Sequence, residues 1–98
     1  MVFGSIRVNL LNKLFIPDIF TPNADGINDV LDIRGTEFFP NMDISIFDRW
    51  GSVVYHAIGY TKPFDGTYRG QPLMNGTYAY KIIASANYIA EGLVVIER

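Results

Sequence analysis

The stretch DISIFDRWGSVVYH, residues 43–56, is the most informative part of the sequence about the fold. Polar and apolar residues alternate from Asp43 to Ile46, and Phe47 and Asp48 end the run, which is typical of a β-strand with one buried face. Arg49-Trp50-Gly51 follows, and glycine at its third position allows the positive φ angle of a tight turn. Residues 52–56 form a second run of β-favouring residues. The stretch therefore predicts a β-hairpin.

Similar patterns recur on both sides of this hairpin. Glycine and proline separate short runs that are rich in aromatic and β-branched residues. The further strands expected are residues 5–10, 15–20, 30–34, 77–84 and 92–98. Proline donates no ladder hydrogen bond, so Pro17 places residues 15–20 at a sheet edge or at a strand start. About seven short strands in one domain predict an all-β, immunoglobulin-like sandwich of antiparallel strands.

The composition excludes several classes of protein. The chain has 98 residues, of which 49% are hydrophobic and 18% charged, so it carries the core of one globular domain and is not intrinsically disordered. A net charge of -2 offers no basic excess for nucleic acid. The absence of cysteine excludes disulfides and thiol chemistry. No apolar run approaches the roughly 18 residues of a membrane span.

One loop, residues 20–29, concentrates oxygen-bearing side chains. The candidate calcium ligands are Asn23, Asp25, Asn28, Asp29 and Asp32. Calcium takes six to eight such oxygens, and Gly26 would let the backbone turn around the ion. The pattern is incomplete, because Thr21 stands where a first acidic ligand would be. Asx turns, in which Asn and Asp bond to their own backbone, are the simpler interpretation. We expect no other cofactor.

Three aromatic residues are candidates for a binding surface. Trp50 at the hairpin tip would offer an exposed ring to a glycan or a protein, or else fold back and cover one end of the core. The second alternative is favoured, because the end of a sandwich needs covering. For Tyr60 and Tyr68 both alternatives stay open, whereas Tyr78 and Tyr80 lie two residues apart and are expected on one face of a strand.

No arrangement of residues predicts catalysis. The only histidine, His56, is expected to be an ordinary surface residue near a strand end. Asp25 and Asp29 would supply a carboxylate pair for glycoside chemistry, but both lie on one turn-rich loop that implies no pocket. The chain is therefore not expected to be an enzyme.

Four segments together resemble a known family. They are residues 20–29, residues 46–55, residues 75–80 and residues 92–98. In this order and spacing they are similar to the gliding motility-associated C-terminal domain, the type B C-terminal sorting domain that Bacteroidetes-type bacteria use for type IX secretion. The resemblance covers about residues 15–98. The sequence departs from the family at Phe64, where the family usually has tryptophan. Phenylalanine keeps the aromatic contact but lacks the indole N–H that donates a hydrogen bond.

The resemblance implies a non-catalytic, immunoglobulin-like sorting module at the end of a large exported protein, often an adhesin. Its expected partners are the outer-membrane secretion machinery and the cargo domains that precede it in the same chain. The expected localisation is secreted or on the cell surface, after passage through the periplasm. An adhesin module that binds glycan or protein, or a spacer, is the alternative.

Two expectations concern the ends of the chain. Residues 1–14 are either the first strand of the sandwich or the tail of a preceding domain, and we expect a segment of a longer protein. At the other end, Gly92, Leu93, Val94, Val95, Ile96, Glu97 and Arg98 are expected to form an edge strand that the secretion machinery contacts. Reversing the charge of Arg98 is expected to leave the core undisturbed.

Overall fold

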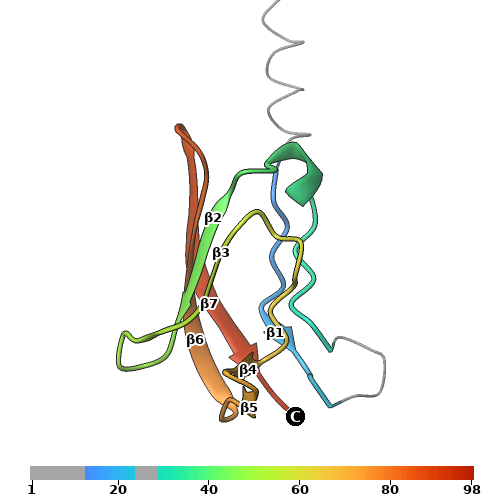
Figure 1. The fold of residues 1–98 in the computed structure, drawn as a ribbon, viewed down its shortest axis with the longest axis vertical. Helices are drawn as coiled ribbons and strands as arrows, with labels where there is room; N and C mark the ends of the chain where they lie inside the picture. The colour runs from blue at the N-terminus through green and yellow to red at the C-terminus, as the bar shows by residue number, and fades with distance from the viewer. Residues whose placement is uncertain (1–12, 24–28) are drawn as a thin grey trace, which may run out of the picture.

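The structure is a computed structural model that describes residues 13–23 and 29–98. Strands in this part of the chain are β1 (Ile19–Phe20), β2 (Asp43–Phe47), β3 (Val53–Ile58), β4 (Thr67–Tyr68), β5 (Gln71–Pro72), β6 (Gly76–Ser85) and β7 (Tyr88–Ile96). The larger sheet has the order β1-β7-β6-β2-β3, and β4 pairs with β5 (Figure 1). The predicted all-β, immunoglobulin-like sandwich is confirmed. The strand expected at residues 5–10 lies outside the described residues.

The predicted hairpin around Trp50 is present as β2 and β3. Ile44 and Ile46 of β2 are fully buried, as the alternation of the sequence predicts. β2 pairs antiparallel with both β3 and β6, so it lies in the interior of the sheet. A register shift beside Phe47 adds a β-bulge next to the turn.

A second, longer hairpin joins β6 to β7. Its inner face carries the buried side chains of Tyr78, Ile82, Val94 and Ile96, which pack against β2 and the opposite layer. The expected turn near Ala86 and Asn87 is confirmed. β7 begins at Tyr88 and not at Gly92, because residues 88–91 continue the alternation of inward and outward side chains.

β1 is shorter than predicted, and it is parallel to its neighbour. Ile19 and Phe20 pair with Val95 and Ile96 of β7 in the parallel sense, so the sandwich is not purely antiparallel. Phe15 leaves this sheet and instead forms an isolated antiparallel bridge with Arg34. Pro17 between these two pairings cannot donate a ladder hydrogen bond, which agrees with the edge position predicted for the segment.

A layer of mostly irregular chain covers the inner face of the larger sheet (Figure 1). The prediction of a strand over residues 30–34 is wrong, because the N–H of Leu31 donates to the carbonyl of Phe64 and only Arg34 makes a bridge. Leu31 and Ile33 are nevertheless buried. The ring of Phe64 is 1% exposed and lies edge-on to Phe20 at 5.6 Å, so the expected aromatic contact is kept.

Arg98 joins three segments of this covering layer. Its Nη1 donates to the carbonyl of Pro22 at 3.1 Å, and its Nη2 donates to the carbonyls of Gly66 at 2.7 Å and Leu73 at 3.0 Å. Its own backbone N–H donates to Oδ1 of Asn75. A guanidinium group has five donors in a fixed, permanently charged fork, which suits three carbonyls that converge from separate loops. These contacts give a reason to expect that a charge reversal at Arg98 would loosen the covering layer, and the expectation that it leaves the core undisturbed stays a prediction.

The conformation of Gly51 gives a first prediction. Its φ angle is +82°, as the tight turn requires, and no atom lies within 4 Å of a Cβ placed there. The cost of a substitution therefore comes from the backbone alone. We expect Gly51→Val to lower the free energy of unfolding by about 1–3 kcal/mol and Gly51→Asn to lower it much less, because asparagine tolerates this region. Urea unfolding measures both. Equal costs would contradict the backbone explanation.

The hydrogen bonds of Arg98 give a second prediction. We expect Arg98→Ala to lower the free energy of unfolding by about 1–2 kcal/mol, because three carbonyls lose a charged donor. Arg69→Ala is the matched control, since that guanidinium lies over the Tyr68 ring at the tip of the β4–β5 hairpin, and its loss should cost less than about 0.5 kcal/mol. Urea unfolding followed by circular dichroism compares the two. Equal destabilisation by the two substitutions would show that the Arg98 hydrogen bonds stabilise the fold no more than an ordinary surface contact does.

Candidate functional site

The tip of the β2–β3 hairpin is held by its own hydrogen bonds. Oδ1 of Asp48 accepts from the N–H groups of Trp50 and Ser52, both at 2.9 Å. The backbone closes the same turn, because the N–H of Asp48 donates to the carbonyl of Ser52 and the N–H of Gly51 donates to the carbonyl of Asp48. An aspartate that bonds to the backbone ahead of it forms an Asx-type turn, which fixes the direction in which Trp50 projects.

Trp50 projects into solvent. Its side chain is 73% exposed, and the guanidinium of Arg49 lies 4.6 Å from the centre of its ring. The favoured expectation that Trp50 covers one end of the core is wrong. Near the hairpin tip, Tyr78 is the aromatic residue that packs in the core, whereas Trp50 follows an Asx-type turn at the tip itself. Stacking on Arg49 holds the indole in a defined position at the surface.

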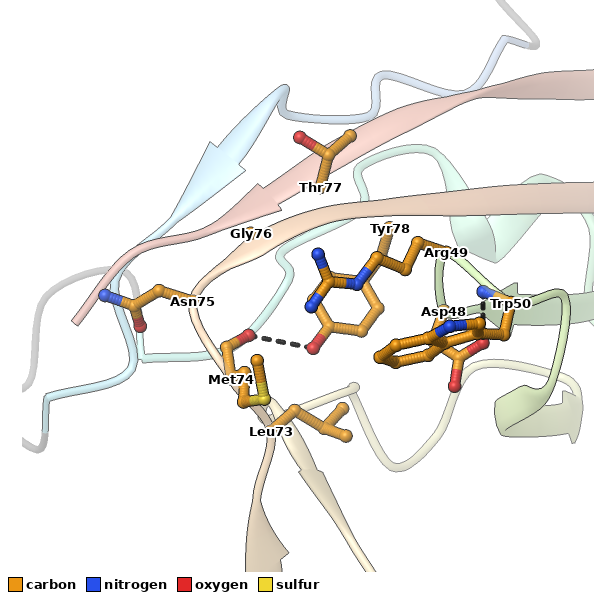
Figure 2. A pocket seen from close by; sticks show the side chains of 9 residues that line it. All are labelled: Asp48, Arg49, Trp50, Leu73, Met74, Asn75, Gly76, Thr77 and Tyr78. Carbon is orange, nitrogen blue, oxygen red and sulfur yellow. Dashed lines mark hydrogen bonds between the residues drawn. The ribbon is translucent and has the colours of Figure 1, made fainter.

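A cavity of about 150 Å³ lies beside this indole (Figure 2). Its walls come from the hairpin tip and from residues 73–78, which lead into β6 and include the half-buried Leu73 and the exposed Met74. The hydroxyl of Tyr78 donates to the carbonyl of Met74 at 2.8 Å, and this hydrogen bond ties β6 to the segment that precedes it. Burial raises the pKa of Tyr78, so its hydroxyl keeps the proton that it donates.

The chemistry of this cavity suits binding. An indole face, a thioether and aliphatic carbon provide apolar contact, while Arg49, Asn75 and Thr77 add polar groups. Aromatic residues, methionine and arginine are enriched where proteins bind other molecules. Asp48 is the acidic residue of its wall, and its Oδ1 accepts from the backbone of the turn. The arrangement resembles a docking pocket more than a centre for proton transfer.

The structure separates the other two predicted binding aromatics from this cavity. The hydroxyl of Tyr60 donates to the carbonyl of Leu31 at 2.6 Å and accepts from the N–H of Phe64 at 3.0 Å. Burial raises the pKa of Tyr60, and its side chain joins parts of the covering layer. Tyr68 is 40% exposed under the guanidinium of Arg69. Trp50 is the predicted aromatic that lines the cavity.

The residues expected to contact the secretion machinery differ widely in accessibility. Val94 and Ile96 are fully buried, and β1 pairs with Val95 and Ile96. The prediction of an edge strand is therefore wrong for the end of β7. Gly92 points inward, where a Cβ would meet the Tyr80 hydroxyl. Leu93 and Glu97 are exposed, and the side chain of Arg98 is bound to three carbonyls.

The structure describes only part of the predicted calcium loop. Asp25 and Asn28 lie outside the described residues. Asn23 and Asp29 each interact with other groups, and Oδ2 of Asp32 lies 3.5 Å from Nε of Arg34. Residues 13–23 and 29–98 contain no group of three histidine, aspartate or glutamate side chains suited to a metal ion. Calcium binding by this loop stays a prediction.

Sequence reasoning missed several functional features. The cavity needs residues 73–78 next to the hairpin tip, and no local pattern indicates that proximity. Asp48 carried a recognisable signal, since aspartate before a tight turn favours an Asx-type turn.

Among residues 13–23 and 29–98, no helix combines the length and the apolar character of a membrane span.

Known proteins resemble this chain in sequence and in fold. The model of the CHU_C type IX secretion signal domain matches residues 14–96. The curated proteins include no significant match to the sequence. PorZ, described as an essential bacterial surface component of the type IX secretion system of Porphyromonas gingivalis, has a solved structure that superposes with a TM-score of 0.66 at 17% identity.

The two similarities carry different weight. The alignment with PorZ covers 90% of this chain but 12% of PorZ, and at this identity it shows a shared fold alone. The family match extends from Leu14, whose N–H donates to the Tyr88 hydroxyl, to Ile96 at the end of β7, and so it spans the whole described core. The chain belongs to the CHU_C type IX secretion signal domain family.

Proposed function

We propose that this domain is a non-catalytic sorting signal that directs the protein carrying it through the type IX secretion system to the cell surface or the medium. The observation that carries the proposal is the family match over residues 14–96, which includes the complete larger sheet. The match coincides with a folded unit and not with a short terminal peptide. The signal is therefore a surface of the folded domain.

Binding, not catalysis, accounts for the site. His56 is the one histidine of the chain, and its Nε2 lies 2.9 Å from Oδ1 of Asp43. Both side chains are about half exposed on the outer face of the sheet, away from the cavity beside Trp50. The cavity itself offers stacking and hydrogen bonding. We propose that the domain as a whole has two partners, the secretion machinery and the cargo domains that precede it in the same protein. The protein would pass through the periplasm on its way out.

A second candidate function is supported by the exposure of Trp50. A tryptophan that is 73% exposed, stacked on arginine and set beside a cavity is a common arrangement for contact with saccharides or proteins. In an adhesin-like protein this cavity would bind a glycan while another surface serves export. The two functions use different parts of the domain and are separable by experiment.

Export of an unrelated protein tests the first proposal. We expect the 98-residue chain, fused after a fluorescent protein that carries a signal peptide, to bring fluorescence to the surface or medium of a host with this secretion system. The same fusion in a host without the system, and the fluorescent protein alone, should stay in the periplasm. Retention of a demonstrably folded fusion in the secreting host would contradict the proposal.

Substitution of Trp50 tests the second candidate. We expect Trp50→Ala to change the free energy of unfolding by less than about 1 kcal/mol, because an exposed indole loses mainly its contact with Arg49. The Trp50→Ala domain should no longer bind oligosaccharides that are immobilised on an array. The Tyr68→Ala domain, which lacks an aromatic ring outside the cavity, should still bind them. Export of the Trp50→Ala fusion should be unchanged. If the unsubstituted domain binds no oligosaccharide, the glycan-binding candidate is wrong.

A further inference from the structure

Among the residues that the structure describes, no strand lies beside most of one edge of β7. β7 lies between β6 and β1, but β1 pairs only with Val95 and Ile96. Upstream of β1, Phe15 exchanges both backbone hydrogen bonds with Arg34 in the covering layer and so does not extend along β7. Within residues 13–23 and 29–98, the edge of β7 over residues 88–94 is left unpaired.

The hydrogen bonds to β1 identify which groups point to this edge. The N–H of Val95 donates to the carbonyl of Asp18 at 2.8 Å, and the N–H of Glu97 donates to the carbonyl of Phe20 at 3.1 Å. Backbone groups alternate sides along a strand, and the register with β6 is unbroken from Ile89 to Ile96. The N–H and C=O groups of Ile89, Glu91 and Leu93 therefore point to the open side.

The side chains of the same three residues lie on the outer face of the sheet, where a charged residue stands between two apolar ones. Ile89 is 53% exposed and Leu93 is 62% exposed, with Glu91 between them. Lys81 of β6 lies opposite Glu91, so the carboxylate has a basic neighbour on one side only. On the inner face, Ala90 packs against the core and the Tyr80 ring lies against Gly92, so the outer face carries the exposed side chains of this edge.

The edge of β7 lacks most of the devices that protect exposed strands. β3, at the other end of the sheet, carries a bulge next to its turn, which disfavours further pairing. β7 has no proline and no bulge between Ile89 and Ile96. Antiparallel pairing with a second copy, in the register that uses all three residues, would place Glu91 against Glu91. Like charges directly opposite each other are destabilising, so the edge disfavours another copy of itself.

We propose that the open edge of β7 at Ile89, Glu91 and Leu93 accepts an extended strand of the secretion machinery, with a basic residue between two apolar residues on its outer face. Backbone hydrogen bonds provide the affinity in this mode, and alternate side chains provide the specificity. The basic residue pairs with Glu91, and the apolar residues pack beside Ile89 and Leu93. The identity of the partner rests on the proposed sorting function.

A synthetic peptide tests the chemistry of the edge directly. The acetylated peptide TVTKTVT places lysine between two valines on one face, and TVTETVT is its charge-reversed control. We expect TVTKTVT to shift the amide resonances of Ile89, Glu91 and Leu93 and to slow their hydrogen exchange, with about two- to fivefold tighter binding than TVTETVT. Absence of these shifts, or shifts centred on β3 or on the cavity beside Trp50, would overturn the proposal.

Two variants separate backbone pairing from charge. Glu91→Pro removes the outward N–H at a position where edge strands tolerate proline, and it should weaken binding of TVTKTVT at least tenfold. Glu91→Arg keeps the backbone intact and should reverse the preference toward TVTETVT, so the test does not depend on the folding of the proline variant. An unchanged preference in Glu91→Arg would overturn the assigned role of Glu91.

Export of the fluorescent fusions connects the edge to sorting. We expect the Glu91→Pro fusion, checked for folding by circular dichroism, to be exported at least fivefold less than the unsubstituted fusion, and the Glu91→Arg fusion to be reduced as well. Ile58→Thr, which alters an exposed residue of β3 at the opposite edge of the sheet, is the matched surface control and should be exported normally. Equal export of all four fusions would overturn the role of the edge and leave the sorting function intact. Retention of the unsubstituted fusion would instead overturn the sorting function itself.

Discussion

The inner face of the five-stranded sheet needs a cover, and the rest of the structure depends on how that cover is held. Ile44, Ile46 and Ile82 are fully buried on this face, and their burial is the main source of stability. No second sheet of similar size covers them in the described part of the chain, since β4 and β5 have two residues each. The cover is mostly irregular chain, which has few ladder hydrogen bonds of its own.

Separate contacts therefore replace a second ladder. Leu31 bonds to Phe64, Tyr60 bonds to both, and the guanidinium of Arg98 holds three further carbonyls. β1 is paired at two residues only, because the chain before it turns into this cover. The open edge of β7 is thus a direct consequence of the way in which the core is closed. The exposed hairpin tip at Trp50 lies outside the cover and is held by Asp48.

Local pattern predicted the regular half of the molecule well. β2 follows from alternation of polar and apolar residues, and β3 and β6 follow from runs of β-favouring residues. The turn at Gly51 follows from the freedom of glycine to adopt a positive φ angle. The segment at residues 30–34 has equally apolar side chains, but its backbone bonds to Phe64 and not to a strand. Composition alone cannot distinguish these two ways of burying an apolar run.

The site was harder to predict than the fold, because it depends on contacts between distant residues. Arg98 bonds to residues 23 to 76 positions away, and no periodicity encodes such a contact. Trp50 was identified from the sequence as a candidate, but its position beside the cavity depends on the turn that Asp48 holds and on the approach of residues 73–78. The expectation of an edge strand at the chain end failed for Val95 and Ile96, since β1 pairs with them in the parallel sense.

Sorting by a folded surface makes one requirement that sorting by a linear peptide does not: export must follow the folded population. The most direct measurement is the exported fraction of fluorescent fusions in a graded series of buried substitutions, such as Ile82→Val, Val94→Ala and Ile46→Ala, set against the free energy of unfolding of each domain. If the folded surface is the signal, export stays complete while the domain is mostly folded and falls steeply once the unfolded form predominates. Undiminished export of a domain that is unfolded at the growth temperature would contradict it.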